Sequence, residues 1–234
     1  MNIIVRNIPN SVTCINLLAG CLAIFCASKG TEALWGLRGW EWSAIFIAIG
    51  AAADFLDGLC ARLLKAYSDL GKELDSLCDL VSFGVAPAMM LTYLLMEKGL
   101  PTVYALTALL IPVAGAVRLA RFNIDTRQAS SFIGLPIPAN AIFWIGYCGL
   151  VVEGADFLTI PGVFFPLILF ECWLMLSPVR LFSLKFRNLR FRDNLHRYLL
   201  ITGALFLVFC MGVGGLMWLI VYYIFLSFAF KSKS

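Results

Sequence analysis

Apolar runs about as long as a membrane is thick recur along the whole sequence. Spanning a hydrocarbon core of about 30 Å takes about 20 mostly apolar residues. We count eight such runs, near residues 11–28, 43–62, 73–96, 101–121, 138–152, 158–178, 196–212 and 214–230. Each must be a helix, because backbone amides cannot stay unpaired in lipid. The sequence therefore predicts an all-α integral membrane protein with about eight transmembrane helices.

The composition agrees with a bilayer environment. Of the 234 residues, 14% are charged and 61% are hydrophobic, whereas a soluble domain has roughly one quarter charged residues. Nucleic-acid binding would need a basic soluble surface, which this composition excludes. No early segment combines a basic region, a short apolar core and a small-residue cleavage site, so we expect the first span to remain in the protein.

The basic residues predict the orientation of the spans. An even number of spans puts both chain ends on one side, and Lys and Arg gather in cytoplasmic loops. All but three of the 18 Lys and Arg residues fall on the side of the termini, and the three exceptions are Lys29, Arg38 and Lys98. We therefore expect a multi-pass protein of the cell (inner) membrane with both termini in the cytoplasm.

The predicted runs form one membrane domain over residues 1–234. It consists of a six-helix core (1–178), a basic interfacial segment (179–195) and two additional C-terminal helices (196–230). From Arg180 to Arg197, apolar and basic residues alternate, which favours a segment lying flat on anionic lipid. Such a segment is either a sensor of phospholipid headgroups or an ordinary positively charged loop.

Four acidic residues lie within apolar helices, where each costs at least about 2.5 kcal/mol to insert near the midplane. Asp54 and Asp57 are three residues apart near the end of the second run, and Asp75 and Asp79 are four apart near the start of the third. Each pair occupies one helical face, so the short link between the runs lets all four carboxylates converge. Clustered anions repel one another unless cations separate them. Mg²⁺ or Mn²⁺ suits such oxygen ligands.

Neighbouring residues suit phosphate chemistry. Gly58 lets a bulky headgroup approach the backbone, and Arg62 can pair with a phosphate oxygen. The alternative is that the acids form ion pairs with Arg62, Lys65 and Lys72 at the interface. That alternative does not account for Asp54, which lies two turns deeper than these bases.

Residues 54–79 read D-x-x-D-G-x-x-A-R-x₈-G-x-x-x-D-x-x-x-D, which resembles the full signature of the CDP-alcohol phosphotransferase family. The resemblance implies a homodimer with a two-metal site, in which Asp54, Asp57 and Asp75 hold metal. It further implies that Asp79 both contacts metal and takes the acceptor's proton. It assigns CDP-lipid binding to Asn10, Thr13, Gly58, Arg62, Ser68 and Gly71. Asn10 and Thr13 are equally ordinary residues for a helix start.

The loop after the fourth run indicates the acceptor. Arg118-Leu-Ala-Arg121-Phe-Asn and Phe132-Ile-Gly-Leu-Pro-Ile-Pro138 resemble segments of bacterial and archaeal phosphatidylserine synthases, as does Ser82-Phe-Gly-Val-Ala-Pro87. The resemblance implies that CDP-diacylglycerol and L-serine give phosphatidylserine and CMP. Arg118 and Arg121 share a helical face that suits the serine carboxylate, although they could equally be positive anchors at the cytoplasmic interface.

Other functions remain possible from the sequence. Glycerol 3-phosphate or an inositol phosphate could replace serine, but each would need a second anion site. A cation transporter would place its acids near the midplane and broken helices in both halves of the chain, whereas these acids crowd one interface. A noncatalytic scaffold would have no reason to retain all the acids of the motif.

Overall fold

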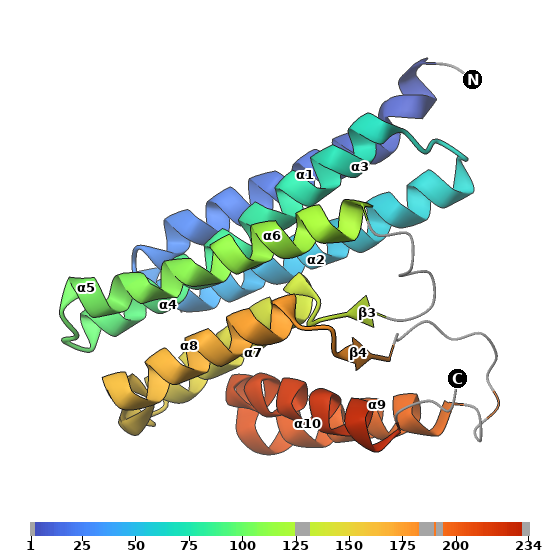
Figure 1. Cartoon of the computed structure of the whole chain (residues 1–234). Helices are drawn as coiled ribbons and strands as arrows, with labels where there is room; N and C mark the ends of the chain where they lie inside the picture. The colour runs from blue at the N-terminus through green and yellow to red at the C-terminus, as the bar shows by residue number, and fades with distance from the viewer. Residues whose placement is uncertain (1–2, 125–131, 183–189, 191–193, 231–234) are drawn as a thin grey trace.

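The computed structural model describes residues 3–124, 132–182, 190 and 194–230, which are almost entirely helical (Figure 1). The first half comprises α1 (Ile3–Ala27), β1 (Ala33–Leu34), β2 (Leu37–Arg38), α2 (Gly39–Leu63), α3 (Asp69–Asp79), the π-helical segment η1 (Leu80–Val85), α4 (Ala86–Glu97), α5 (Thr102–Ala105), the 3₁₀ segment η2 (Leu106–Leu109) and α6 (Leu110–Ile124). The second half comprises β3 (Phe132–Ile133), α7 (Ile137–Val152), η3 (Asp156–Thr159), α8 (Pro161–Leu176), β4 (Arg180–Leu181), α9 (Leu195–Met211), η5 (Gly212–Gly214) and α10 (Gly215–Ala229). The predicted all-α membrane fold is confirmed.

Every predicted apolar run coincides with a helix, but the helices differ in length. Five described segments are long and apolar enough to cross a membrane: 7–27, 39–63, 69–97, 102–124 and 195–229, the last containing both α9 and α10. Helices α7 and α8 have 16 residues each, so each is about 24 Å long. Helix α8 is shorter than the predicted run 158–178, because Ser177 is already extended before Pro178.

Helix α1 begins earlier than predicted and brings residues before position 11 into the bundle. It continues through Pro9 without interruption, and the Thr13 hydroxyl donates a hydrogen bond of 3.0 Å to the Pro9 carbonyl. The tight β1–β2 turn, in which Ala33 pairs with Arg38, then returns the chain as α2 beside α1. Residues 9–13 thus lie on the same helix as the buried residues of α1.

Helices α3 and α4 form one continuous rod through η1 (Figure 1). A π turn closes its hydrogen bonds over one residue more than an α turn and often occurs at functional sites. Ser82, Phe83 and Gly84 are buried one after another in this turn. The rod carries Asp75 and Asp79 at one end and the apolar core of α4 at the other.

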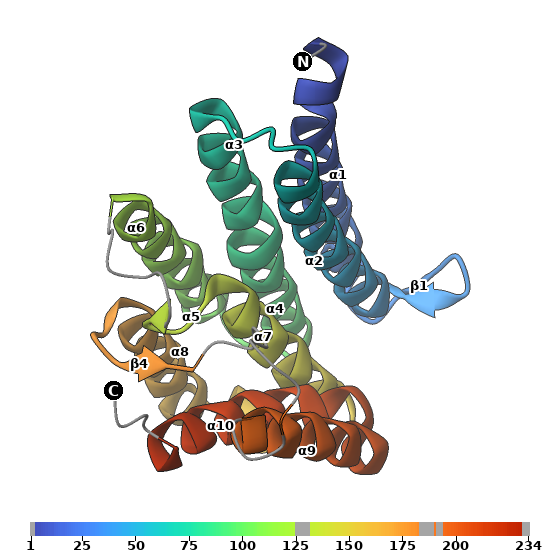
Figure 2. The same ribbon diagram turned by 90° about the vertical axis from the view of Figure 1, so that its right-hand side faces the viewer.

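The two C-terminal helices form a layer against the other helices. Figure 2 shows α1 and α2 at one side of the molecule, α9 and α10 at the opposite side, and α7 between them. Helix α10 packs on α7, and α9 packs on α10. The contact is close at Gly146 of α7, where an added Cβ would lie 2.1 Å from the Met217 backbone nitrogen. Small residues allow this kind of backbone approach between membrane helices.

Gly146→Ala is expected to destabilise the docking of α10 by about 1–3 kcal/mol, because the backbone of α10 must move away from the new methyl group. The check is the thermal midpoint of the detergent-solubilised protein. Gly162→Ala in α8 is the matched control, since an added Cβ there meets nothing within 4 Å. Equal midpoints for the two variants would contradict the close α7–α10 contact.

Most inter-helix connections that carry basic residues lie at one end of the molecule. Figure 1 shows the start of α1, the link between α2 and α3, the end of α6 and the β3–β4 pair at the same right-hand side. The predicted interfacial segment 179–195 lies largely outside the described residues. Its described start, Arg180–Leu181, is extended and pairs antiparallel with Phe132–Ile133.

Candidate active site

Three acidic side chains from two helices meet inside the bundle. Asp54 and Asp57 project from α2 and Asp75 projects from α3. One carboxylate oxygen of each lies within 4.8 Å of those of the other two. Helices α2 and α3 both pack against α1, so their acids face one another across a gap. The spacing in the sequence predicts that all four acids of the motif converge, and the structure brings these three together.

The nearby bases are engaged elsewhere. Arg62 Nε donates to the Gly58 carbonyl at 2.9 Å, and Lys72 Nζ donates to the Asn123 carbonyl at 2.6 Å. Within the part of the chain that the structure describes, none of the motif's carboxylates forms an ion pair with Arg62, Lys65 or Lys72. Interfacial ion pairing therefore does not explain why the acids are clustered.

Two carboxylate oxygens of this cluster are buried without a hydrogen-bond partner. They are Asp57 Oδ2 and Asp75 Oδ1. Asp57 is only 6% exposed. Buried polar atoms nearly always have partners, and converging carboxylate oxygens are the ligands that hard divalent cations prefer. The side chains present here therefore fit a divalent cation.

The fourth acid has a different environment. Asp79, at the end of α3, lies outside the group of three, and its Oδ1 accepts a hydrogen bond of 3.2 Å from Asn16 Nδ2. Asn16 is fully buried, and its backbone carbonyl accepts a hydrogen bond from the Ser82 hydroxyl at 2.9 Å. Asn16 thus links Asp79 to α1 through its side chain and to the π turn through its backbone carbonyl.

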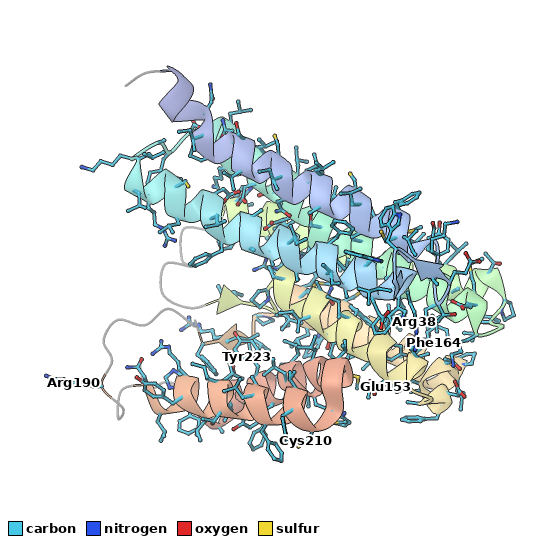
Figure 3. The ribbon with its side chains drawn as sticks, turned by 180° about the vertical axis from the view of Figure 1, so that it is seen from behind. Arg38, Glu153, Phe164, Arg190, Cys210 and Tyr223 are labelled. Carbon is cyan, nitrogen blue, oxygen red and sulfur yellow. The ribbon has the colours of Figure 1, made fainter. Side chains whose placement is uncertain are left out.

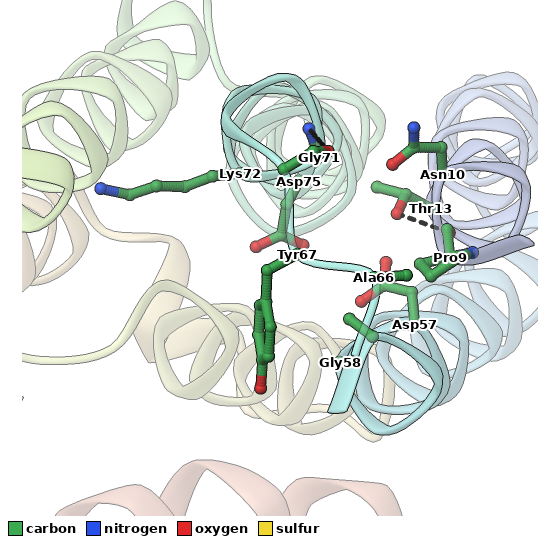
Figure 4. Close-up of a pocket in the computed structure, with 12 residues that line it drawn as sticks. Pro9, Asn10, Thr13, Asp57, Gly58, Ala66, Tyr67, Gly71, Lys72 and Asp75 are labelled. Atoms are coloured by element: carbon green, nitrogen blue, oxygen red, sulfur yellow. Dashed lines mark hydrogen bonds between the residues drawn. The ribbon is translucent and has the colours of Figure 1, made fainter. Parts of the chain in front are cut away.

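A pocket of about 220 Å³ opens beside the acids. Figure 4 shows its walls: α1, α2, the link between α2 and α3, and the start of α3. The residues predicted to bind the CDP-lipid that line it are Asn10, Thr13, Gly58, Ser68 and Gly71, joined by Asp57 and Asp75. Arg62, also predicted there, is exposed and is not among the lining residues.

Two of the lining residues also shape the backbone. Ser68 is the N-cap of α3, and its hydroxyl oxygen accepts a hydrogen bond of 3.0 Å from the Gly71 amide. A Cβ at Gly71 would lie 2.9 Å from the Asn10 side-chain oxygen, whereas a Cβ at Gly58 would meet nothing within 4 Å. Gly71 therefore permits the contact between α1 and α3, and Gly58 leaves space in the pocket.

The two predicted acceptor-binding arginines have different surroundings. Arg118 is 7% exposed, its Nε has no hydrogen-bond partner, and its guanidinium lies 5.6 Å from the centroid of the Phe122 ring. Arg121 is exposed, and its Nη1 donates to the carbonyl of Leu176, the last residue of α8, at 3.2 Å. Arg121 thus caps the end of α8. The buried guanidinium of Arg118 remains available to an anionic ligand.

Some residues at the site were not predicted. Pro9, Ala66, Tyr67 and Lys72 line the pocket, although the Lys72 side chain points away from its centre (Figure 4). Asn16 is the most important omission, because it contacts Asp79. The sequence feature that indicates Asn16 as a site residue is its position three residues after Thr13, on the same face of an apolar helix.

Comparison with known proteins agrees with this geometry. The protein-family model described as CDP-alcohol phosphatidyltransferase matches residues 6–177, roughly three quarters of the chain, and ends just after α8. The match includes all the acids of the motif and both arginines. It does not include α9 and α10.

Curated relatives carry a more specific name. The chain is 41% identical over 131 residues to the CDP-diacylglycerol–serine O-phosphatidyltransferase of Bacillus subtilis, covering 56% of this chain and 69% of that relative. It is 40% identical over 144 residues to the protein of the same name from Methanocaldococcus jannaschii, covering 62% and 61%. A third, from Helicobacter pylori, is 34% identical over 207 residues, covering 86% and 81%.

Proposed function

Because this chain belongs to the CDP-alcohol phosphatidyltransferase family, we propose that it transfers the phosphatidyl group of CDP-diacylglycerol to L-serine. The products are phosphatidylserine and CMP. The names of its relatives in three organisms support this donor and this acceptor. The observation that carries the proposal is the convergence of Asp54, Asp57 and Asp75 beside a pocket that five of the residues predicted to bind the CDP-lipid line.

We propose that the acidic residues hold two divalent ions, either Mg²⁺ or Mn²⁺. Asp54, Asp57 and Asp75 supply the converging oxygens, and Asp79 completes the set. Bound divalent ions neutralise the pyrophosphate and stabilise the attacking and leaving oxygens together. The unpartnered oxygens of Asp57 and Asp75 support this assignment.

The reaction forms one phosphorus–oxygen bond and breaks another. The serine hydroxyl oxygen attacks the phosphorus that carries diacylglycerol, and the pyrophosphate bond to CMP breaks. We propose that Asp79 takes the hydroxyl proton. The hydrogen bond from Asn16 to Asp79 Oδ1 fixes that carboxylate while leaving its second oxygen to accept the proton.

The pocket is the proposed site for the donor nucleotide. Asn10 and Thr13 lie on its α1 wall, and Gly58, Ser68 and Gly71 lie on its α2 and α3 walls; Arg62 reaches it by leaving the Gly58 carbonyl. Large apolar side chains are exposed on the outer faces of α1 and α2, Leu18 at 60% and Phe55 at 64%. Those faces suit the diacyl tails, which stay in the bilayer while the nucleotide enters from the cytoplasm.

Arg118 is the proposed partner of the serine carboxylate. A buried guanidinium with an unpartnered Nε is suited to a planar anion. Helix α6, which carries Arg118, packs against η1, the segment that directly follows Asp79, and this supports an acceptor bound on the Asp79 side of the acids. Arg121 already binds the end of α8, so the geometry favours Arg118 over Arg121.

We further propose that the protein is a homodimer in the cytoplasmic membrane with both termini and the active site facing the cytoplasm. The distribution of Lys and Arg supports this orientation. The helix ends next to the connections that carry basic residues lie on one side of the molecule, as far as the structure describes them (Figure 1).

The test is CMP release by the purified protein from CDP-diacylglycerol with Mg²⁺ or Mn²⁺. Serine, glycerol 3-phosphate and inositol phosphate are supplied in separate reactions. Release with serine alone supports the proposal. Release only with another acceptor would support the proposed acidic site but contradict serine as the acceptor. No release with any acceptor would favour a transporter.

Gly58→Ala is expected to raise KM for CDP-diacylglycerol about tenfold without lowering the thermal midpoint. The new methyl group meets no protein atom within 4 Å, so the fold is not strained, but it projects into the pocket where the nucleotide binds. The two quantities are measured on the same preparation. A lowered midpoint with an unchanged KM would contradict the placement of the donor at Gly58.

A further inference from the structure

The segment from Phe132 to Pro138, which resembles part of the phosphatidylserine synthases, is held in place by the end of α8. The Gly134 amide donates to the Val179 carbonyl at 2.8 Å, and the Leu135 amide donates to the Leu174 carbonyl at 3.1 Å. Gly134 has a φ of 74°, and a Cβ there would lie 2.3 Å from the Met175 carbonyl oxygen. Strands β3 and β4 therefore form one rigid unit with the helix end that Arg121 binds.

Tyr223 of α10 holds this unit from the other side. Its hydroxyl donates a hydrogen bond of 2.8 Å to the carbonyl of Phe182, which directly follows β4. The two rings meet edge to face with centroids 5.0 Å apart. Tyr223 is only 6% exposed, and Figure 3 shows it on the side of α10 that faces the strands.

The unit that Tyr223 holds is also tied to the helix that carries the buried arginine. Arg121 of α6 donates to the Leu176 carbonyl at the end of α8, and Arg118 lies one turn earlier on α6. Both Tyr223 and Arg118 are buried. One side chain from outside the matched region 6–177 thus contacts the β4 segment, which belongs to the same unit as the helix end that α6 binds.

We propose that Tyr223 is a positioning residue for the acceptor, which anchors β4 through Phe182 and so fixes the β3–β4 unit and Arg118 relative to each other. This inference rests on the proposed function. It assigns the last helix of the chain a role in recognising serine and none in binding the donor. The donor pocket is lined only by residues between Pro9 and Asp75, far from α10 in the fold (Figure 2).

The test compares Tyr223→Phe with Tyr222→Phe in the full-length protein, assayed for CMP release in mixed micelles. Tyr223→Phe keeps the ring contacts and removes only the hydroxyl. We expect KM for serine to rise about three- to tenfold, the cost of one buried hydrogen bond, with kcat and KM for CDP-diacylglycerol within twofold of wild type. Tyr222 is the matched control because it packs against Gly203 of α9 instead, so its variant should keep all three values.

The outcomes separate the two proposals. If wild-type protein releases no CMP with serine, the proposed function fails and the inference falls with it. If wild type is active and Tyr223→Phe keeps its KM for serine, only the inference fails. A fall in kcat with both KM values unchanged would show a purely structural role for the hydroxyl and would also overturn the inference.

Discussion

Asp54→Asn is expected to lower CMP release on the order of a thousandfold, because an amide removes the negative charge that a divalent cation needs while keeping the shape of the side chain. The loss should depend on the metal concentration. Raising Mg²⁺ or Mn²⁺ should recover part of the activity, since the variant still retains Asp57 and Asp75 at the cluster. The measurement is turnover across a metal titration.

The matched control for this variant is Asp69→Asn. Asp69 is an exposed acid in the first turn of α3, outside the cluster. The same chemical change there removes one surface charge near a helix start, an effect of about 0.3–1 kcal/mol on stability. Full activity of Asp54→Asn, or an equal loss in both variants, would disprove the proposed metal site.

Asp79→Asn is expected to lower kcat by about 10²–10⁴-fold, the usual contribution of a positioned general base. Asparagine can still pair with Asn16 but cannot take the serine proton, so KM for CDP-diacylglycerol should change little. Unlike that of Asp54→Asn, this loss should not be recovered by added metal. Steady-state kinetics with both substrates varied separates kcat from KM.

Cys148→Ala provides the control for a buried change away from the site. Cys148 lies on α7 and is fully buried, so its replacement should leave kcat intact. If Asp79→Asn turns over at the wild-type rate, Asp79 is not the base. If added metal restores it, Asp79 acts mainly as a metal ligand.

The acidic site was predictable because periodicity and charge both constrain it. Residues three or four apart share a helical face, and a carboxylate within an apolar helix needs a compensating partner. These rules predict that the acids of the motif converge, and the structure brings Asp54, Asp57 and Asp75 together. The charge rule does not apply to Asn16, because its amide is neutral, and only its spacing, three residues after Thr13, points to the site.

Other differences between the predicted and the observed structure come from tertiary contacts, which no local sequence pattern encodes. Arg118 and Arg121 share a helical face by spacing, but Arg121 lies near an uncapped carbonyl at the end of α8 and binds it. Arg118, one turn earlier, is enclosed by helices and keeps its charge unpaired at Nε. The early start of α1 was missed because Pro9 is a poor signal for a helix interior.

The π turn at Leu80–Val85 sets the rotational phase between the two halves of the α3–α4 rod. One residue corresponds to about 100° of rotation in an α-helix, and a π turn accommodates one residue more than an α turn. Asp75 therefore faces the acids of α2 and Asp79 faces Asn16 of α1, while Leu91 and Leu94 remain buried in the core. Deleting a single residue from this segment would change no charge and little apolar area, yet it would turn one of these two faces away from its partners. The length of the segment, more than its side chains, links the geometry of the site to the packing of the bundle.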